Sequence, residues 1–310
     1  MPHSSENIGS GILAGALTGV FWGLPFLAPQ VLKGFSAVEI AFGRFFFFGL
    51  ISLFFLGPVV EILRKLGPKE RFRLVLLSAS GFWLYSALLF WGIQRTDGIL
   101  SSLILGMLPV TIPLFSDASR SDKQRATPGI LLILTGLSLL FVIPGIQGRV
   151  RWSGKDWSGA LVLLGCLALW TWYAVANGVF LRQNPWVSRR HLSSVMGVLS
   201  LAFMVPWMLV GSAPLQWPDR PGFAGYLMVS FGLGAGSSWF ANWLWNYCSY
   251  HVPPAISGTL LVFETLFGLL YSFAFEQRLP RMEETAAILL CLGGVLWSVL
   301  GRQRDRSAGS

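Results

Sequence analysis

Two charged residues lie inside long apolar stretches of the sequence. Glu264 lies near the middle of the stretch from 254 to 275, and Arg44 lies about eight residues inside the stretch from 36 to 56. A charge at the centre of a bilayer costs roughly 2.5–3.5 kcal/mol on insertion scales, so each side chain is expected to face the protein interior and find a partner. These two residues are therefore the first candidates for binding chemistry.

The two charges allow different kinds of chemistry. Glu264 could bind a solute or exchange a proton, since desolvation penalises the charged form of a carboxyl group, or it could only fix helix packing through a hydrogen bond. Arg44 could bind a carboxylate or phosphate through two parallel hydrogen bonds, or it could neutralise Glu264 or the carbonyl end of a helix. Each residue type is compatible with both roles.

Aromatic and amide side chains form a second group of candidates. Asn242 and Asn246 are one helical turn apart in a stretch rich in aromatic residues, and Trp22 and Trp170 lie in two other apolar stretches. Tryptophan often lies at the lipid interface, but a ring that faces a cavity would stack on an aromatic solute or attract a cation. The candidate solute-binding residues are therefore Glu264, Trp22, Trp170, Asn242, Asn246 and Arg44.

Proline and glycine mark places where helices bend or pack closely. Pro25 and Pro29, and likewise Pro109 and Pro113, interrupt two apolar stretches. Proline removes a helix hydrogen bond and exposes a carbonyl, so each pair indicates either a hinge beside a cavity or a simple kink. The glycine-rich run from 232 to 236 has the spacing of a phosphate-binding loop, but no strand precedes it, so close helix packing is the expected role.

Several other classes of protein are disfavoured. No Ser/His/Asp or Cys/His arrangement and no pair of carboxylates can be assembled, so an enzyme is not expected. The three cysteines and three histidines lack metal-ligand spacing, and we expect no metal site and no cofactor. The net charge of +9 is not gathered into a basic stripe with aromatic residues, so nucleic acid is not an expected partner.

The candidate residues must be positioned by membrane-spanning helices. The sequence is 54% hydrophobic and only 12% charged, whereas a soluble domain has about 25% charged residues. Most apolar stretches have the roughly 20 residues that cross a bilayer as a helix. Ten spans are predicted, at 10–31, 36–56, 72–92, 99–116, 127–146, 158–181, 191–211, 222–247, 254–275 and 283–301.

The distribution of basic residues predicts the orientation of these spans. With the amino terminus inside, the inner side holds 14 of the 23 Lys and Arg residues and the outer side holds 8, with Arg44 as the remaining one. Cytoplasmic loops of membrane proteins are enriched in Lys and Arg. The sequence therefore predicts a multi-pass protein of the cytoplasmic membrane with both termini in the cytoplasm.

A faint internal repeat relates the two halves of the chain. Gly11 and Trp22 align with Gly159 and Trp170 at an offset of 148. The offset rises to 154 for two further glycine pairs, at 43 and 197 and at 57 and 211, and to 157 for the pair at 136 and 293. Two repeats of five spans each, at 1–150 and 157–302, must insert with opposite orientation because five is odd, as in many secondary transporters.

Short motifs in these spans resemble the EamA-type family of the drug/metabolite transporter superfamily over nearly the whole chain. They are Gly19-Val20-Phe21-Trp22-Gly23, Arg44 after Ala41-Phe42-Gly43, Leu108-Pro109, Ala168-Leu169-Trp170, Glu264, and Phe275-Glu276-Gln277-Arg278-Leu279. The family pattern often has a Gly-Glu pair at the last motif and a matching one after the fourth span. Here Phe275 replaces that glycine, and the first half offers only Ser116-Asp117.

The expected protein is an all-α membrane protein with ten helices in two inverted five-helix repeats. The resemblance implies a secondary transporter that exports an amino acid, another metabolite or a drug by alternating access, with protons as a candidate coupling ion. The cavity is expected between the first, fourth, sixth and ninth spans. No nucleotide-binding motif is present, so direct drive by ATP is not expected. The alternative is a membrane scaffold or sensor that transports nothing.

Overall fold

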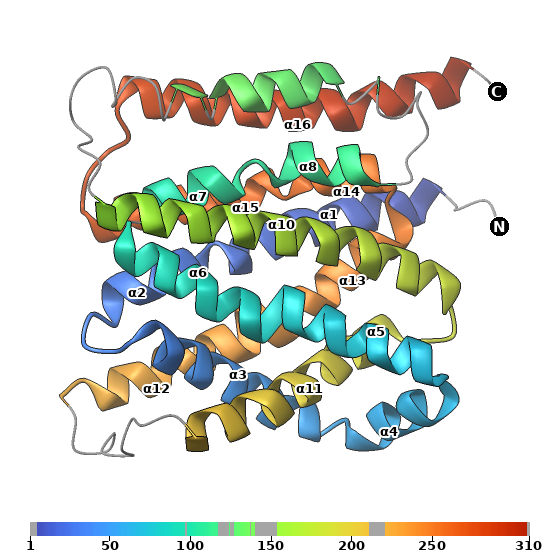
Figure 1. Cartoon of the computed structure of the whole chain (residues 1–310). Helices are drawn as coiled ribbons and strands as arrows, with labels where there is room; N and C mark the ends of the chain where they lie inside the picture. Colours follow the sequence, from blue (N-terminus) through green and yellow to red (C-terminus); the bar gives the residue numbers. More distant parts are fainter. Residues whose placement is uncertain are drawn as a thin grey trace.

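In the computed structural model, long helices lie roughly side by side in one bundle (Figure 1). The structure describes residues 5–96, 98–116, 124, 127–136, 138–139, 154–210 and 221–308, and within these ranges it contains no strand. The helices are α1 (Ser5–Trp22), η1 (Leu24–Phe26), α2 (Ala28–Val31), α3 (Ala37–Leu53), α4 (Leu56–Lys65), α5 (Pro68–Ser78), η2 (Ala79–Trp83), α6 (Leu84–Arg95), α7 (Gly98–Leu105), α8 (Leu108–Phe115), Thr127–Gly136, α10 (Gly154–Gln183), α11 (Arg189–Val210), α12 (Phe223–Gly232), η3 (Leu233–Phe240), α13 (Ala241–His251), α14 (Pro254–Leu260), α15 (Val262–Phe275) and α16 (Met282–Ala308).

Four stretches in the described ranges are long and apolar enough to cross a membrane. They are Ile8–Val31, Pro68–Arg95, Gly154–Gln183 and Ile256–Phe275. A fifth is added if α3 and α4 form one span, although these two helices meet at 87°. The first, third, sixth and ninth predicted spans are thus present, and the total of ten stays a prediction. Residue 137 and residues 140–146 of the predicted fifth span, and residue 211 of the seventh, lie outside the described ranges.

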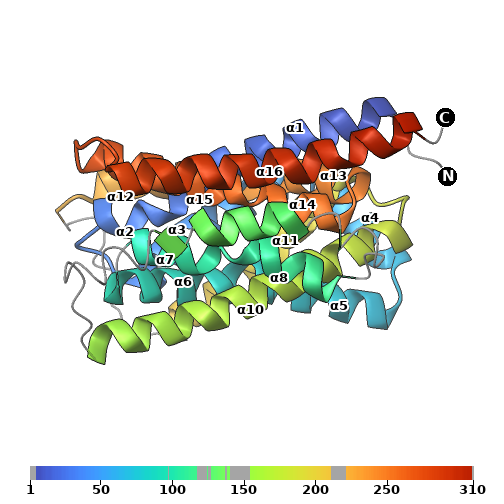
Figure 2. The same ribbon diagram turned by 90° about the horizontal axis from the view of Figure 1, so that it is seen from above.

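The start of the first helix and the end of the last helix lie at the same end of the bundle. The two helices are α1 and α16, which can be followed in both Figure 1 and the view in Figure 2. The helix α4 lies at this end too. An even number of crossings returns a chain to its starting side, so the positions of the two ends fit the predicted pattern.

Three of the four prolines fall at helix breaks, and Pro113 lies inside α8. After Trp22 the first span continues as the short 3-10 helix η1, which contains Pro25, and then as α2, which contains Pro29. Pro109 lies in the first turn of α8, after the break that separates it from α7. Proline suits the first turn of a helix because its missing N–H would have no partner there. Pro25, Pro29 and Pro109 therefore coincide with divisions of these spans.

Two helices contain a wider π-helical segment in their middle. One is η2, between α5 and α6, and the other is η3, between α12 and α13. They begin at Ala79 and Leu233, which are 154 positions apart. The same offset relates Gly43 to Gly197 in the sequence. Segments of this kind are rare in proteins and frequently occur at functional sites.

The packing of the helices is reciprocal between the two halves. The helix α1 packs against α13 and α15, whereas α10 packs against α6, α7 and α8. In terms of the predicted spans, the first contacts the eighth and ninth, and the sixth contacts the third and fourth. The helices α3 and α11 cross where Gly49 lies against Leu201 and Gly197 lies against Ser52, so closely that a Cβ atom on either glycine would overlap its neighbour.

Candidate functional site

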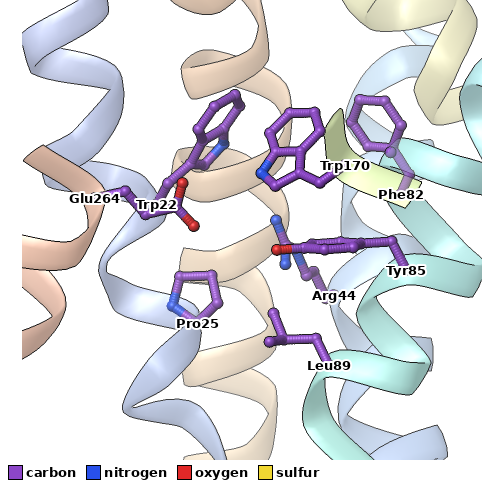
Figure 3. Close-up of a pocket in the computed structure, with 9 residues that line it drawn as sticks. Trp22, Pro25, Arg44, Phe82, Tyr85, Leu89, Trp170 and Glu264 are labelled. Atoms are coloured by element: carbon purple, nitrogen blue, oxygen red, sulfur yellow. The ribbon is translucent and has the colours of Figure 1, made fainter. Parts of the chain in front are cut away.

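A small cavity lies between helices from both halves of the chain, and Figure 3 shows its lining. Its volume of about 20 Å³ has room for roughly one water molecule. The site is therefore closed in this structure. Its lining residues are Trp22, Pro25, Arg44, Gly81, Phe82, Tyr85, Leu89, Trp170 and Glu264.

Glu264 enters the cavity from the first turn of α15, which starts after a break at the end of α14. The side chain is buried, and its Oε2 atom has no hydrogen-bond partner. Figure 3 shows the carboxyl group directed into the cavity, with the indole nitrogen of Trp170 on the side that faces it. A buried polar atom without a partner costs about 1–3 kcal/mol, so a purely structural role leaves this atom unexplained.

Arg44 approaches the cavity from α3 and is buried as well. Its Nε donates to Ser238 Oγ at 2.8 Å, its Nη1 to Ser86 Oγ at 3.2 Å and its Nη2 to the carbonyl of Ser237 at 3.3 Å. These acceptors orient the guanidinium group but carry no charge. Arg44 and Glu264 line the same cavity without an ion pair within 4 Å, so neither side chain holds the other by direct contact.

The π-helical segment η3 holds Arg44 and Trp22 together. The carbonyl of Ser237 accepts from Trp22 Nε1 at 2.9 Å as well as from Arg44 Nη2. The segment lies very close to α3, because a Cβ atom at Gly234 would come within 2.8 Å of the Arg44 carbonyl and of the Phe48 nitrogen. The glycine-rich run thus serves helix packing, as its sequence context indicates.

Aromatic rings form one wall of the cavity. The ring centroids of Trp22 and Trp170 are 5.0 Å apart, and those of Tyr85 and Trp170 are 5.8 Å apart. The ring of Trp245, which is buried behind them, lies 5.4 Å from that of Trp22. The hydroxyl oxygen of Tyr85 has no hydrogen-bond partner. The cavity therefore combines flat apolar surfaces with two unsatisfied polar oxygens, on Tyr85 and Glu264.

The structure brings together four of the six candidate residues. Trp22, Arg44, Trp170 and Glu264 line one cavity. Asn242 and Asn246 do not line it, although both are buried in the adjacent helix α13. The amide oxygen of Asn242 accepts from the hydroxyl of Tyr173 at 2.9 Å, and that of Asn246 accepts from the Asn177 amide at 2.9 Å.

The set of helices around the cavity differs in part from the expected set. The first, sixth and ninth spans contribute, but the fourth span, α7 and α8, supplies none of the lining residues. Instead it supports the neighbouring spans, through a hydrogen bond between Thr111 and Thr171 at 2.7 Å and one from Thr265 to the Ser102 carbonyl at 3.4 Å. The missing walls come from α3, η2 and α6, whose residues Phe82 and Tyr85 the sequence reasoning did not select.

The motif at the end of α15 forms a turn outside the cavity. Arg278 donates two hydrogen bonds to Glu284 at the start of α16, at 2.8 and 3.0 Å, and one to Glu276 at 2.6 Å. The bonds to Glu284, and less strongly those to Glu276, hold the pKa of Arg278 above its ordinary value. In this chain the motif connects two helices and makes no contact with the candidate site.

Comparison with known proteins places the chain among transporters. The sequence profile of the EamA-like transporter family matches residues 9–143. Inner membrane protein YtfF of Escherichia coli (strain K12) is 30% identical over 309 residues, which cover 94% of this chain and 95% of that protein. Uncharacterized transporter YyaM of Bacillus subtilis (strain 168) is 22% identical over 282 residues, 88% of each chain.

A similar fold also occurs among solved structures. One crystal structure has a TM-score of 0.72 with this chain and 18% sequence identity. The match covers 96% of this chain and 99% of the other. At this low identity the likeness concerns the fold alone.

Proposed function

The chain belongs to the EamA-like transporter family of the drug/metabolite transporter superfamily, and we propose that it exports a small organic solute by alternating access. It is a multi-pass protein of the cytoplasmic membrane, in agreement with its apolar helices and with a relative that is named an inner membrane protein. The observation that carries the proposal is the closed cavity, in which Arg44 and Glu264 are not paired with each other.

The lining of the cavity suggests the chemistry of the solute. The guanidinium group of Arg44 suits a carboxylate, and the carboxylate of Glu264 suits an amine. The rings of Trp22, Trp170 and Tyr85 suit a flat apolar group, since aromatic pairs prefer contacts of this kind. A solute with both charges and an aromatic group, such as an aromatic amino acid, would match all three features.

Alternating access follows from the proposed organisation in two inverted repeats, 1–150 and 157–302. The reciprocal packing of the helices and the π-helical segments at an offset of 154 support this organisation. In a transporter of this type the repeats move against each other around a site at their interface. With this proposed organisation the cavity would lie at such an interface, because Trp22 and Arg44 come from the first half of the chain and Trp170 and Glu264 from the second. It has to enlarge to admit a solute.

Protons are the proposed coupling ion, and Glu264 is the proposed carrier. A carboxyl group that alternately faces a solute and water can release its proton on one side of the membrane and take it up on the other. The proposal also keeps both termini in the cytoplasm, on the basis of the basic residues in the loops. Reporter fusions at Ser310 that give signal only from the cytoplasm are the expected result, and an external signal would reverse the direction of every step.

A flux measurement on the purified protein tests the function. Liposomes containing the protein would be preloaded with phenylalanine, glutamate, lysine or ethidium, and uptake of the same labelled compound would be followed with and without a pH gradient. We expect uptake of phenylalanine well above that of protein-free liposomes. Folded protein that moves none of the four compounds would favour the scaffold or sensor alternative.

A further inference from the structure

A row of polar side chains connects the cavity with one end of the bundle. The hydroxyl of Tyr173 donates to Asn242 Oδ1 at 2.9 Å, and the amide of Asn177 donates to Asn246 Oδ1 at 2.9 Å. The amide of Asn246 in turn donates to the carbonyl of Arg189 at 3.1 Å, at the start of α11. We call Tyr173, Asn177, Asn242 and Asn246 the polar ladder.

The ladder is continuous with the cavity because of helical spacing. Tyr173 and Asn177 lie three and seven residues after Trp170, on one face of α10. The ring of Tyr173 stacks on that of Trp170, which lines the cavity, with centroids 4.4 Å apart. Asn242 and Asn246 lie one turn apart on the facing helix α13. The ladder therefore leads from the cavity toward Arg189, the end predicted to be cytoplasmic.

The ladder is incompletely hydrogen-bonded although its four side chains are buried. The amide nitrogen of Asn242 and the amide oxygen of Asn177 have no partner, and neither does the indole nitrogen of Trp245 beside them. An interface that is always closed would be more stable with apolar side chains, because a half-satisfied polar network is unfavourable in a low dielectric. The three unpaired polar atoms have a physical explanation if they form hydrogen bonds with water or solute in a second conformation of the protein.

We propose that the ladder is the inner half of the solute path, closed here and opened when α10 and α13 separate. Resting on the proposed transport function, the proposal assigns Asn177, Asn242 and Asn246 as polar groups that hydrogen-bond the solute between the cavity and the end of the bundle. Figure 3 shows the apolar lining residues Pro25 and Leu89 on the side of the cavity away from Trp170, from which the ladder starts.

Thiol labelling tests whether the ladder becomes accessible to water. The variant Asn177→Cys would be made with Cys166, Cys248 and Cys291 replaced by alanine, and treated with N-ethylmaleimide in liposomes. The matched control is Ser200→Cys, a buried polar position between α5 and α11 that is hydrogen-bonded to Ser78. We expect the thiol at position 177 to react at least tenfold faster than the one at position 200. Equal rates would overturn the proposal.

A second variant tests whether the ladder is part of a solute path or only holds α10 and α13 together. Replacing both partners, as in Tyr173→Phe with Asn242→Leu, removes one rung together with its unsatisfied nitrogen. In the Asn177→Cys background, we expect labelling at least fivefold slower and an unfolding midpoint equal to or higher than that of the single variant. If the ladder only holds the two helices together, the substitutions should make labelling faster and lower the unfolding midpoint. That outcome also overturns the proposal.

The transport function is judged separately. Phenylalanine counterflow by the wild-type protein tests the proposed function, whereas the labelling rates need no solute. Flux with equal labelling at positions 177 and 200 would place the path elsewhere. If position 177 is labelled as expected but no compound in the panel is transported, the ladder is accessible to water and the proposed transport of these compounds is wrong.

Discussion

The guanidinium group of Arg44 and the carboxyl group of Glu264 line the same cavity without forming an ion pair. Arg44 directs its donors to Ser86, Ser237 and Ser238 instead. Neutral acceptors fix the position of the guanidinium group, and no carboxylate among the described residues lies in direct contact with it. Both charges are therefore free to act on a bound solute, and each can be changed separately.

The first prediction concerns Glu264. The Glu264→Gln variant preserves the shape and hydrogen bonding of the side chain but cannot ionise. We expect it to fold and bind phenylalanine, and to lose the dependence of phenylalanine flux on pH. Flux measured between about pH 5 and pH 8 checks this, and an unchanged pH profile would end the coupling hypothesis.

The Glu264→Leu variant is the companion to that experiment. If Glu264 only fixes helix packing, the leucine variant should lower the stability of the bundle by on the order of 1 kcal/mol, while the glutamine variant transports normally. Thermal unfolding of the two variants beside the wild type separates the roles.

The second prediction concerns Arg44. A lysine keeps the charge but presents one nitrogen where arginine presents a planar fork to three acceptors. We expect Arg44→Lys to reduce phenylalanine counterflow at least tenfold and to lower stability by about 1–3 kcal/mol, since hydrogen bonds to charged groups are strong. Ethidium has no carboxylate, so its flux should fall less; an equal fall for both compounds would argue against carboxylate binding. Arg64→Lys, on the exposed side of α4, is the control.

The third prediction concerns the contact between η3 and α3. A methyl group at Gly234 would come within 2.8 Å of backbone atoms of Arg44 and Phe48, which cannot move aside as a flexible side chain could. We expect Gly234→Ala to destabilise the protein by about 1–3 kcal/mol and to reduce flux, because Arg44 would be displaced.

Gly232 provides the matched control for that substitution. It lies two residues earlier, and a Cβ atom there would meet nothing within 4 Å. Gly232→Ala should be neutral or slightly stabilising, since alanine is the better helix former by about 1 kcal/mol. Similar unfolding midpoints for the two variants would show that η3 can move away from α3 at little cost.

The fourth prediction concerns the turn between α15 and α16. Since the pKa of Arg278 is held above its ordinary value, mainly by the bonds to Glu284, only the carboxyl group titrates in the acid range. The bidentate pair should stabilise the fold at neutral pH and be lost as the pH falls to where Glu284 takes up a proton. Burial raises the pKa of Glu284, but the hydrogen bonds from Arg278 and from the Arg281 N–H hold it below its ordinary value. We expect Glu284→Gln to lower the unfolding midpoint by roughly 2–4 °C at pH 7, and this difference to shrink only as the pH falls below the ordinary range of a glutamate carboxyl group.

An exposed ion pair serves as the control for the bidentate pair of Arg278 and Glu284. Glu61 and Lys65 form an ion pair at 2.6 Å on the surface of α4. Surface pairs of this kind contribute little, because solvent screens them and both side chains lose freedom. Glu61→Gln should leave the midpoint unchanged at every pH. A fall as large as that of Glu284→Gln would indicate a general charge effect.

The sequence was sufficient for the helical class and for the core of the candidate site. Glu264 and Arg44 could be selected because a charge in an apolar stretch has to face the protein interior. Trp22 and Trp170 could be selected because they align in the predicted internal repeat. Both rules rest on energetic cost or on symmetry, and both select residues that line the cavity.

The remaining site residues could not be predicted because they depend on irregular geometry. No sequence pattern distinguishes a π-helical segment from an ordinary helix, so the contacts of Ser237 and Ser238 with Arg44 were not foreseen. Asn242 and Asn246 were selected as solute-binding residues but do not line the cavity, because spacing alone gives neither the depth of a side chain nor the partner helix it meets. Depth is set by how the helices shift along one another.

The bend of 87° between α3 and α4 has a consequence for the surrounding lipid. A helix of ten residues is about 15 Å long and, with its side chains, about 10 Å wide. At nearly a right angle to α3, a helix of this length lies along the bilayer surface when α3 crosses the membrane. The charged residues Glu61, Arg64 and Lys65 are exposed on α4, so the charge of the lipid headgroups should influence how firmly this end of the protein is held at the membrane surface.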